Sequence, residues 1–242
     1  MSLYVVSIPI GHPDDITLRA IETLKNADIL ICEEYKEGRK LIKRLNIDKE
    51  LYNLNEHNEE DEVDELIQLL LKGKTAAIFS DCGTPLFADP GTRLVNRCHE
   101  AGIRVIPIPG PSSLLAALSV AGVEINQFYY AGFLSRKPED RRHEIEKLTR
   151  FHCPVVIYDT PYRLKALLSD LKRDIPSAQQ IVLLLSLTKP DERIVRGSVS
   201  EVLTQLNNAS QKKEFVLILR PFFQNSKKSN KHVKKYKKQI RF

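Results

Sequence analysis

Short runs of apolar and β-branched residues alternate, in the first half of the chain, with segments in which apolar residues recur every three to four positions. The runs predict strands and the longer periodic segments predict helices. We expect strands at residues 3–8, 28–32, 75–80 and 103–108. We expect helices at residues 18–26, at residues 59–72 and from Asp89 onward. This order predicts an α/β domain with parallel strands.

Local capping signals support two of these helix boundaries and one in the second half of the chain. Asp89 followed by Pro90 suits an N-cap and a first helical position, and Gly102 suits the end of the same helix. Ser198 and Glu201 have the spacing of a capping box, which predicts that the last helix begins at this point.

The second half contains strand-sized runs that follow one another without a helical crossover at every step, which predicts a mixed sheet. The runs lie at residues 128–134, 154–158, 181–187, 193–197 and 214–220. A charged helix is predicted near residues 138–149 and another after residue 198. We therefore predict an N-terminal domain over residues 1–110, a C-terminal domain over 111–222 and a basic tail over 223–242. Because no Gly/Ser linker separates the two domains, we expect them to pack closely with a cleft between them.

Composition narrows the class of protein. The 242 residues are 42% hydrophobic and 28% charged, which excludes disorder throughout. No apolar run approaches the roughly 20 residues that span a bilayer. Four cysteines lack paired or zinc-site spacing, so we expect reduced thiols in a cytoplasmic protein and no metal: Cys32, Cys82, Cys98 and Cys153.

The positive charge is concentrated at the C-terminal end. The chain has a formal net charge of +6, yet the tail from Gln224 to Phe242 carries Lys and Arg residues and no acidic residue. A Lys-rich segment with few apolar residues is expected to be mobile and to contact phosphates, as in RNA. A tail that only increases solubility is the alternative.

Four turns rich in Gly, Pro and small hydroxyl residues follow predicted strands. They are SIPIGHPDD, SDCGTPLFADPG, IPGPSS and YDTPYR. Ligands of open α/β sheets bind at the carboxyl ends of strands, so the four turns together favour one ligand site over four ordinary tight turns. Neither a GxGxxG fingerprint nor a GxxxxGK[ST] phosphate loop occurs, which argues against dinucleotide and nucleoside-triphosphate enzymes. The chain also lacks a nucleophile-elbow motif, which argues against a hydrolase.

The motifs in these turns resemble those of the tetrapyrrole methylases, from Leu3 to about Leu219. The resemblance is carried, in order, by SIPIGHPDDITLRAIETLKNAD, EHNE, SDCGTPLFADPG, AGIRVIPIPGPSSLLAALSVAG, FYYAGFLSRK, TPYRL, LTK, VRGSVSEVL and EFVLIL. Within the family, Pro9-Ile10-Gly11, Gly83-Thr84-Pro85 and EHNE are similar to the branch that methylates a ribose 2′-oxygen in small-subunit ribosomal RNA.

The resemblance implies a homodimer of two-domain α/β subunits that binds S-adenosylmethionine in the cleft between the domains. By motif position, the residues near this cofactor are Ile10, Asp81, Thr84, Phe87, Ser112, Ser113 and Tyr158. It also implies ribosomal RNA, or the small ribosomal subunit, as the partner.

Several positions depart from the pattern of that branch, and they lie on the acceptor side more than on the cofactor side. The chain has Glu33-Glu34-Tyr35-Lys36 where the branch has Glu-Asp-Thr-Arg, and Asp159-Thr160-Pro161-Tyr162-Arg163 where it has Glu-Ser-Pro-His-Arg. Leu185 and Ser186 replace an Arg-Glu pair, and Cys82 replaces an Ala. Cofactor binding is therefore a firmer expectation than the identity of the substrate.

A ribose hydroxyl is a poor nucleophile at neutral pH, so a nearby base would assist its methylation. Candidate bases are Glu33, Glu34 and Asp81, and candidate phosphate or acceptor contacts are Arg39, Arg163 and Lys189. Each could instead be a surface ion pair or a helix cap. His57, within EHNE, is expected to order a loop or a helix entry.

Two alternatives to ribosomal RNA methylation stay open at this point. One is methylation of a tetrapyrrole or another small molecule. The other is an RNA- or ribosome-binding protein without turnover, which the replacement at Leu185 and Ser186 suggests.

Overall fold

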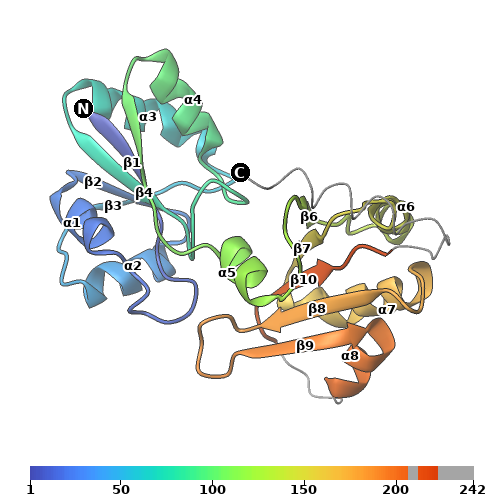
Figure 1. Cartoon of the computed structure of the whole chain (residues 1–242). Coiled ribbons are helices and arrows are strands. Elements are labelled where there is room, and N and C mark those ends of the chain that lie inside the picture. The colour runs from blue at the N-terminus through green and yellow to red at the C-terminus, as the bar shows by residue number, and fades with distance from the viewer. Residues whose placement is uncertain (207–211, 223–242) are drawn as a thin grey trace, which may run out of the picture. The chain divides into compact units, whose positions relative to one another are not determined.

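The computed structural model describes residues 1–206 and 212–222, which form two compact units (Figure 1). Unit 1 consists of Met1–Val120 together with Ser186–Arg193. Unit 2 consists of Ala121–Leu185 and the described residues from Ile194 onward. The basic tail predicted for residues 223–242 lies outside the described residues.

Unit 1 contains a five-stranded sheet in the order β3-β2-β4-β1-β5. Its strands are β1 (Ser2–Val6), β2 (Ile29–Cys32), β3 (Leu51–Asn53), β4 (Thr75–Phe79) and β5 (Arg104–Ile108). All four neighbouring pairs are parallel, with Ser2 opposite both Thr75 and Arg104. The predicted parallel α/β domain is confirmed. All five strands therefore end at the same edge of the sheet.

Helices cover both faces of this sheet (Figure 1). They are α1 (Leu18–Asn26), α2 (Tyr35–Arg44), α3 (Glu59–Leu71) and α4 (Thr92–Glu100). A fifth helix, α5 (Ser113–Val120), follows β5 and does not cover the sheet (Figure 1). Because strand side chains alternate between faces, Ile29 and Ile31 pack with apolar residues of α3 and α4, whereas Leu30 and Cys32 pack with those of α1 and α2. Both faces are buried, which explains why the strands are almost continuously apolar.

The prediction that a helix begins at Asp89 is wrong. The structure has α4 beginning at Thr92, with Gly91 as the N-cap residue at φ 113°. The first turn is capped from another helix, because the Glu59 carboxylate accepts hydrogen bonds from the backbone N–H groups of Gly91 (2.9 Å) and Arg93 (3.2 Å). Asp89 is thereby free for another role, described below.

Unit 2 contains a second five-stranded sheet in the order β6-β7-β10-β8-β9. Its strands are β6 (Tyr129–Phe133), β7 (Val155–Asp159), β8 (Gln180–Leu185), β9 (Arg193–Ser198) and β10 (Phe215–Leu219). Strand β6 is parallel to β7, whereas β10 is antiparallel to β7 and β8, so the predicted mixed sheet is confirmed.

The helical elements of unit 2 are α6 (Pro138–Leu148), the 3₁₀ helix η1 (Pro161–Arg163), α7 (Leu164–Asp174) and α8 (Val199–Gln205). The capping box predicted for the last helix is present, with Ser198 and Glu201 each hydrogen-bonded to the backbone of the other. None of the helices in residues 1–206 and 212–222 is long and apolar enough to cross a membrane.

Candidate active site

Three loops at the carboxyl edge of the unit 1 sheet are hydrogen-bonded to one another. Ile8, after β1, exchanges two backbone hydrogen bonds with Gly83, after β4, at 2.9 and 3.1 Å. The Thr84 hydroxyl donates to the Pro111 carbonyl, after β5, at 3.0 Å and lies 3.1 Å from the Ser7 hydroxyl. The loops that follow β1, β4 and β5 therefore form one framework.

Two glycines permit this close approach. Gly83 has φ 75°, in the left-handed region, and a Cβ there would lie 3.1 Å from the Ile10 side chain. A Cβ on Gly110 would lie 2.9 Å from the Ser7 Cβ. At Gly110 a larger residue would force the loops after β1 and β5 apart, whereas at Gly83 the positive φ is the main reason for glycine.

Replacing Thr84 by Val should loosen the framework, because Val has the same shape but cannot make the two hydroxyl contacts. We expect T84V to lower the free energy of unfolding by about 1 kcal/mol and to weaken binding of S-adenosylmethionine, the cofactor expected from the sequence. Thr84→Ser, which keeps the hydroxyl, is the matched control. Urea unfolding and calorimetric titration of both variants measure the two effects, and equal values for T84V and T84S would contradict the assignment.

An open cavity of about 520 Å³ lies beside this framework. Apolar side chains, hydroxyl groups and two carboxylates line it, among them Ile10, Asp14, Asp15, Thr17, Ser112 and Thr188. Two of the predicted cofactor residues, Ile10 and Ser112, thus share one cavity, and Ser113 follows as the first residue of α5. Phe87 lies in the loop after β4 and is 49% exposed.

The segment Ser186–Arg193 reaches this cavity although it connects two strands of unit 2. The backbone N–H of His12 donates to the Thr188 hydroxyl at 2.8 Å. Thr188 has φ 62°, and its own N–H donates to the Glu192 carboxylate at 2.7 Å. Gly11 fits closely here, since a Cβ on it would lie 2.4 Å from the Leu187 carbonyl oxygen and 2.9 Å from the Lys189 Cγ.

Three carboxylates gather at the ends of β2 and β4. Burial, followed by the negative charges of Asp89 and Asp81, raises the pKa of Glu33 to about 7. Burial also raises the pKa values of Asp81 and Asp89, while hydrogen bonds from Ser80 and from the Leu86 N–H oppose the shift at Asp89. A space of about 10 Å³, close to the volume one water molecule needs, lies between Glu33, Ser80 and Asp89.

Glu33 and Asp81 were predicted from the sequence, whereas Asp89 was missed as a site residue. Because Asp89 followed by Pro90 is typical of a helix cap, Asp89 was not considered as a site residue. Its position in the same Gly/Pro-rich loop as Asp81 is the feature of the sequence that indicates a place in the site.

The raised pKa of Glu33 predicts a pH-dependent stability. The unfolded chain releases this proton near pH 4.5 and the folded chain near pH 7, so the folded state binds more protons in that window and loses stability as the pH rises through it. We expect Glu33→Gln to match the wild type at pH 4.5 and to melt about 2–4 °C higher at pH 8. Glu65→Gln, on the exposed side of α3, is the control. A melting difference that stays constant from pH 4.5 to 8 would show that Glu33 has an ordinary pKa.

Glu34, the exposed N-cap residue of α2, borders this cluster: its backbone N–H donates to the Asp81 carboxylate, and its charge helps to raise the pKa values of Glu33 and Asp81. The other predicted residues of unit 1 lie elsewhere. The Arg39 guanidinium lies 5.6 Å from the centre of the Tyr35 ring. Lys189 is half-buried in the segment that contacts Gly11. His57 is exposed just before α3, where its backbone N–H donates to the Asn55 side chain at 2.9 Å.

In unit 2, Tyr158 and Arg163 lie at the end of β7. The Tyr158 ring meets the rings of Tyr130 and Phe133 edge to face, at 5.2 and 6.1 Å between centroids. The Arg163 guanidinium donates to the carbonyls of Leu134 and Ser135 at 3.0 and 2.9 Å and lies 3.4 Å from the Asp159 carboxylate. These contacts hold the turn after β6.

Removing the Arg163 guanidinium should therefore destabilise unit 2. Arg163→Met keeps the length of the side chain but leaves two carbonyls and the buried Asp159 carboxylate without this partner. We expect a loss of roughly 1.5–3 kcal/mol in unfolding free energy, measured by urea denaturation. Arg136→Met, an exposed neighbour on the same turn, should change stability little. If the two variants were equally stable, the contacts of Arg163 would be energetically unimportant.

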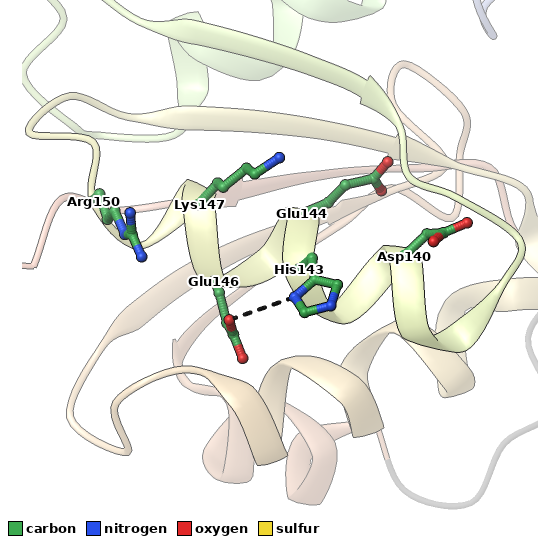
Figure 2. Close-up of a pocket in the computed structure, with 6 residues that line it drawn as sticks. All are labelled: Asp140, His143, Glu144, Glu146, Lys147 and Arg150. Carbon is green, nitrogen blue, oxygen red and sulfur yellow. Dashed lines mark ion pairs between the residues drawn. The ribbon is translucent and has the colours of Figure 1, made fainter.

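A second open depression, of about 440 Å³, follows α6 (Figure 2). Its lining consists of charged side chains from this helix and the residues after it: Asp140, His143, Glu144, Glu146, Lys147 and Arg150. The one ion pair among the residues drawn joins His143 Nδ1 and Glu146 Oε2 at 3.9 Å. No predicted site residue lines it, and its side chains are typical of a solvated helix face.

The arrangement in unit 1 combines an apolar, hydroxyl-lined cavity at strand ends with a neighbouring carboxylate cluster. The family described as Tetrapyrrole (Corrin/Porphyrin) Methylases matches residues 2–203. The chain belongs to this family. It is therefore an enzyme of a methyltransferase family, as the motifs in the strand-end loops predicted.

Relatives with the name "Ribosomal RNA small subunit methyltransferase I" match most of the chain. The relative from Neisseria meningitidis serogroup B is 40% identical over 222 residues, which cover 91% of this chain and 76% of the relative. The relative from Leptospira biflexa is 37% identical and covers 90% of each chain, and that from Bacillus subtilis is 35% identical over 90% of this chain and 74% of its own.

Two solved structures share the fold. A cobalt precorrin-4 methyltransferase of cobalamin biosynthesis superposes with a TM-score of 0.69 at 18% identity, covering 90% of this chain and 94% of its own. A uroporphyrin-III-C-methyltransferase from Thermus thermophilus superposes with a TM-score of 0.62 at 21% identity and the same coverage.

Proposed function

We propose that this protein uses S-adenosylmethionine to methylate a ribose 2′-oxygen in small-subunit ribosomal RNA. The observation that carries the proposal is the 33–40% identity, over at least 90% of the chain, to relatives whose names specify small-subunit ribosomal RNA. The framework of strand-end loops in unit 1, with its cavity, supplies the physical basis.

The cavity beside Ile10 and Ser112 suits this cofactor. Its volume of about 520 Å³ lies in the usual range for small-molecule sites. The apolar side chains fit an adenine ring and a thioether chain, and the Ser112 hydroxyl and the carboxylates of Asp14 and Asp15 offer contacts to polar groups. The hydroxyls of Thr17 and Thr188 already accept hydrogen bonds from Ala20 and His12 and can still donate one. When bound, the cofactor supplies an electrophilic methyl group on its sulfonium.

The residues of the chain would then have three tasks. The loops after β1, β4 and β5, joined through Thr84, hold the cofactor in a fixed orientation. Glu33, whose pKa is raised to about 7 by burial and by the charges of Asp89 and Asp81, accepts the proton of the ribose hydroxyl. Lys189, on the segment that contacts Gly11, is placed to approach a phosphate.

The test is incorporation of labelled methyl from S-adenosylmethionine into small ribosomal subunits purified from cells that lack this protein. Nuclease digestion then identifies any 2′-O-methyl nucleotide. We expect one new 2′-O-methyl site. Label on a base, or label in a tetrapyrrole precursor but not in RNA, would replace this function by the corresponding alternative. Cofactor binding without any transfer would favour the RNA-binding protein without turnover.

Other expectations from the resemblance stay predictions. They are the contribution of Tyr158 and of unit 2 to the cofactor site, a homodimer and a cytoplasmic location. Sedimentation of the purified protein tests the dimer.

A further inference from the structure

Tyr162 is the most exposed aromatic side chain in the described part of the chain, at 77%. It is the middle residue of η1, between Pro161 and Arg163. Single exposed apolar side chains are common on protein surfaces, so exposure alone does not indicate a function. The surroundings of this ring are what distinguish it.

The backbone that carries Tyr162 is held rigidly. Pro161 fixes its own φ, and the Arg163 N–H donates to the Thr160 carbonyl at 3.0 Å. The Arg163 guanidinium anchors the same turn to the carbonyls of Leu134 and Ser135. A ligand that contacts the Tyr162 ring would therefore meet a pre-organised surface, which lowers the entropy cost of binding.

One cationic side chain lies against this exposed ring, since the Lys212 ammonium is 5.2 Å from the centre of the Tyr162 ring. Other basic residues are exposed on adjoining segments. Arg136 and Lys137 follow Ser135, whose carbonyl binds Arg163, and Lys165 is on the first turn of α7. An aromatic face beside an ammonium group, on a basic surface, is the combination that binds an unpaired nucleotide, by stacking on its base and contact with its phosphates.

An apolar protein partner fits this surface less well. On η1 and α7, Tyr162 is the one large apolar side chain that is exposed, and the other exposed apolar side chains of unit 2, such as Phe133, lie on or beside the strands. A protein interface needs a continuous apolar core, whereas stacking on a base needs a single ring.

We propose that Tyr162 stacks on an unpaired base of the RNA substrate, with Lys212 as a phosphate contact. This inference rests on the proposed function and extends it, because it assigns a contact for a single-stranded nucleotide to unit 2. It also gives a physical reason for an exposed tyrosine at this position.

The absence of tryptophan from the whole sequence allows a direct test. Tyr162→Trp creates a protein with a single tryptophan, whose emission a stacked base quenches. We expect saturable quenching when a single-stranded oligoribonucleotide is added to the full chain. Heparin, a polyanion without bases, should bind without this quenching. Leu71→Trp, at the exposed end of α3, is the control and should not respond to the RNA.

Unchanged Tyr162→Trp emission at RNA concentrations that saturate binding would refute the stacking. This readout is needed because the Lys-rich tail is expected to bind phosphates wherever the bases lie, so affinity alone does not report on Tyr162.

Methylation kinetics then separate this inference from the proposed function. Tyr162→Phe keeps the ring and should retain the wild-type KM for the ribosomal subunit, whereas Tyr162→Leu should raise KM by roughly fivefold or more, with S-adenosylmethionine affinity unchanged. Lys212→Ala should reduce the salt dependence of RNA binding, and Lys172→Ala, on the last turn of α7, should not. If the wild type methylates the subunit and Tyr162→Leu has an unchanged KM, only the stacking is wrong. If the wild type transfers no methyl group to RNA, the proposed function itself fails.

Discussion

Glu33→Gln should lower the kcat of ribose methylation by about 100-fold or more, because general-base assistance contributes at least that factor where the acceptor is a hydroxyl. Glu33 has a pKa of about 7. The kcat of the wild type should therefore rise with pH and level off above neutrality, as the carboxylate loses its proton. For Glu33→Gln, the remaining kcat should not show this titration. Single-turnover methylation between pH 5.5 and 9 measures both.

Asp81→Asn distinguishes the base from its neighbours. The charge of Asp81 raises the pKa of Glu33, so its removal should shift the pH midpoint of kcat downward while turnover persists. If Asp81 were itself the base, Asp81→Asn would instead abolish the pH-dependent step and Glu33→Gln would keep it. Glu65→Gln, on the exposed side of α3, should leave both the rate and the midpoint unchanged.

The sequence predicts the fold well where the apolar pattern is strong. The helix Leu18–Asn26 and the strands around Thr75 and Val155 lie where the periodicity places them, because their apolar residues are buried in the hydrophobic cores of the two units. Helix α2 and strand β3 were not predicted. Residues 35–44 are mostly charged, and only Gly38 and Ile42 are buried. The few apolar residues do lie on one side of the helix, but they are too few to form an apolar pattern that is noticed in the sequence, and packing on the sheet stabilises the helix.

The site is less accessible to sequence reasoning because it depends on contacts between distant segments. The hydroxyls of Ser7 and Thr84 are 77 positions apart in sequence, yet they lie 3.1 Å apart. The predicted N-cap at Asp89 is wrong for the same reason. Glu59, from α3, caps α4 instead, and Asp89 belongs to the carboxylate cluster. Short-range patterns cannot contain this information, because tertiary contacts decide which of two acidic residues becomes the cap.

Replacing Gly11, which contacts residues 187–189, is the second change for which we expect a large effect, on stability and on cofactor binding. Gly11 does not have a left-handed φ, so an added Cβ introduces no backbone strain of its own. It would, however, lie 2.4 Å from the Leu187 carbonyl oxygen and 2.6 Å from the Thr188 hydroxyl. Gly11→Ala should therefore displace the segment Ser186–Arg193 at a cost of about 1–3 kcal/mol in stability, and weaken S-adenosylmethionine binding at least tenfold.

Two further variants make this prediction specific. Gly73 has open space where a Cβ would lie, but its φ is 93°. Gly73→Ala should therefore lower stability through backbone strain alone and leave cofactor affinity unchanged. Thr188→Ala should not rescue Gly11→Ala, because the nearest obstacle is the Leu187 backbone carbonyl, which no side-chain truncation removes. Calorimetric titration of S-adenosylmethionine into the three proteins decides the matter. If Gly11→Ala binds the cofactor with wild-type affinity, the segment Ser186–Arg193 does not shape the cofactor site. If only the variants that contain Gly11→Ala lose affinity, cofactor binding depends on this segment, which connects two strands of unit 2.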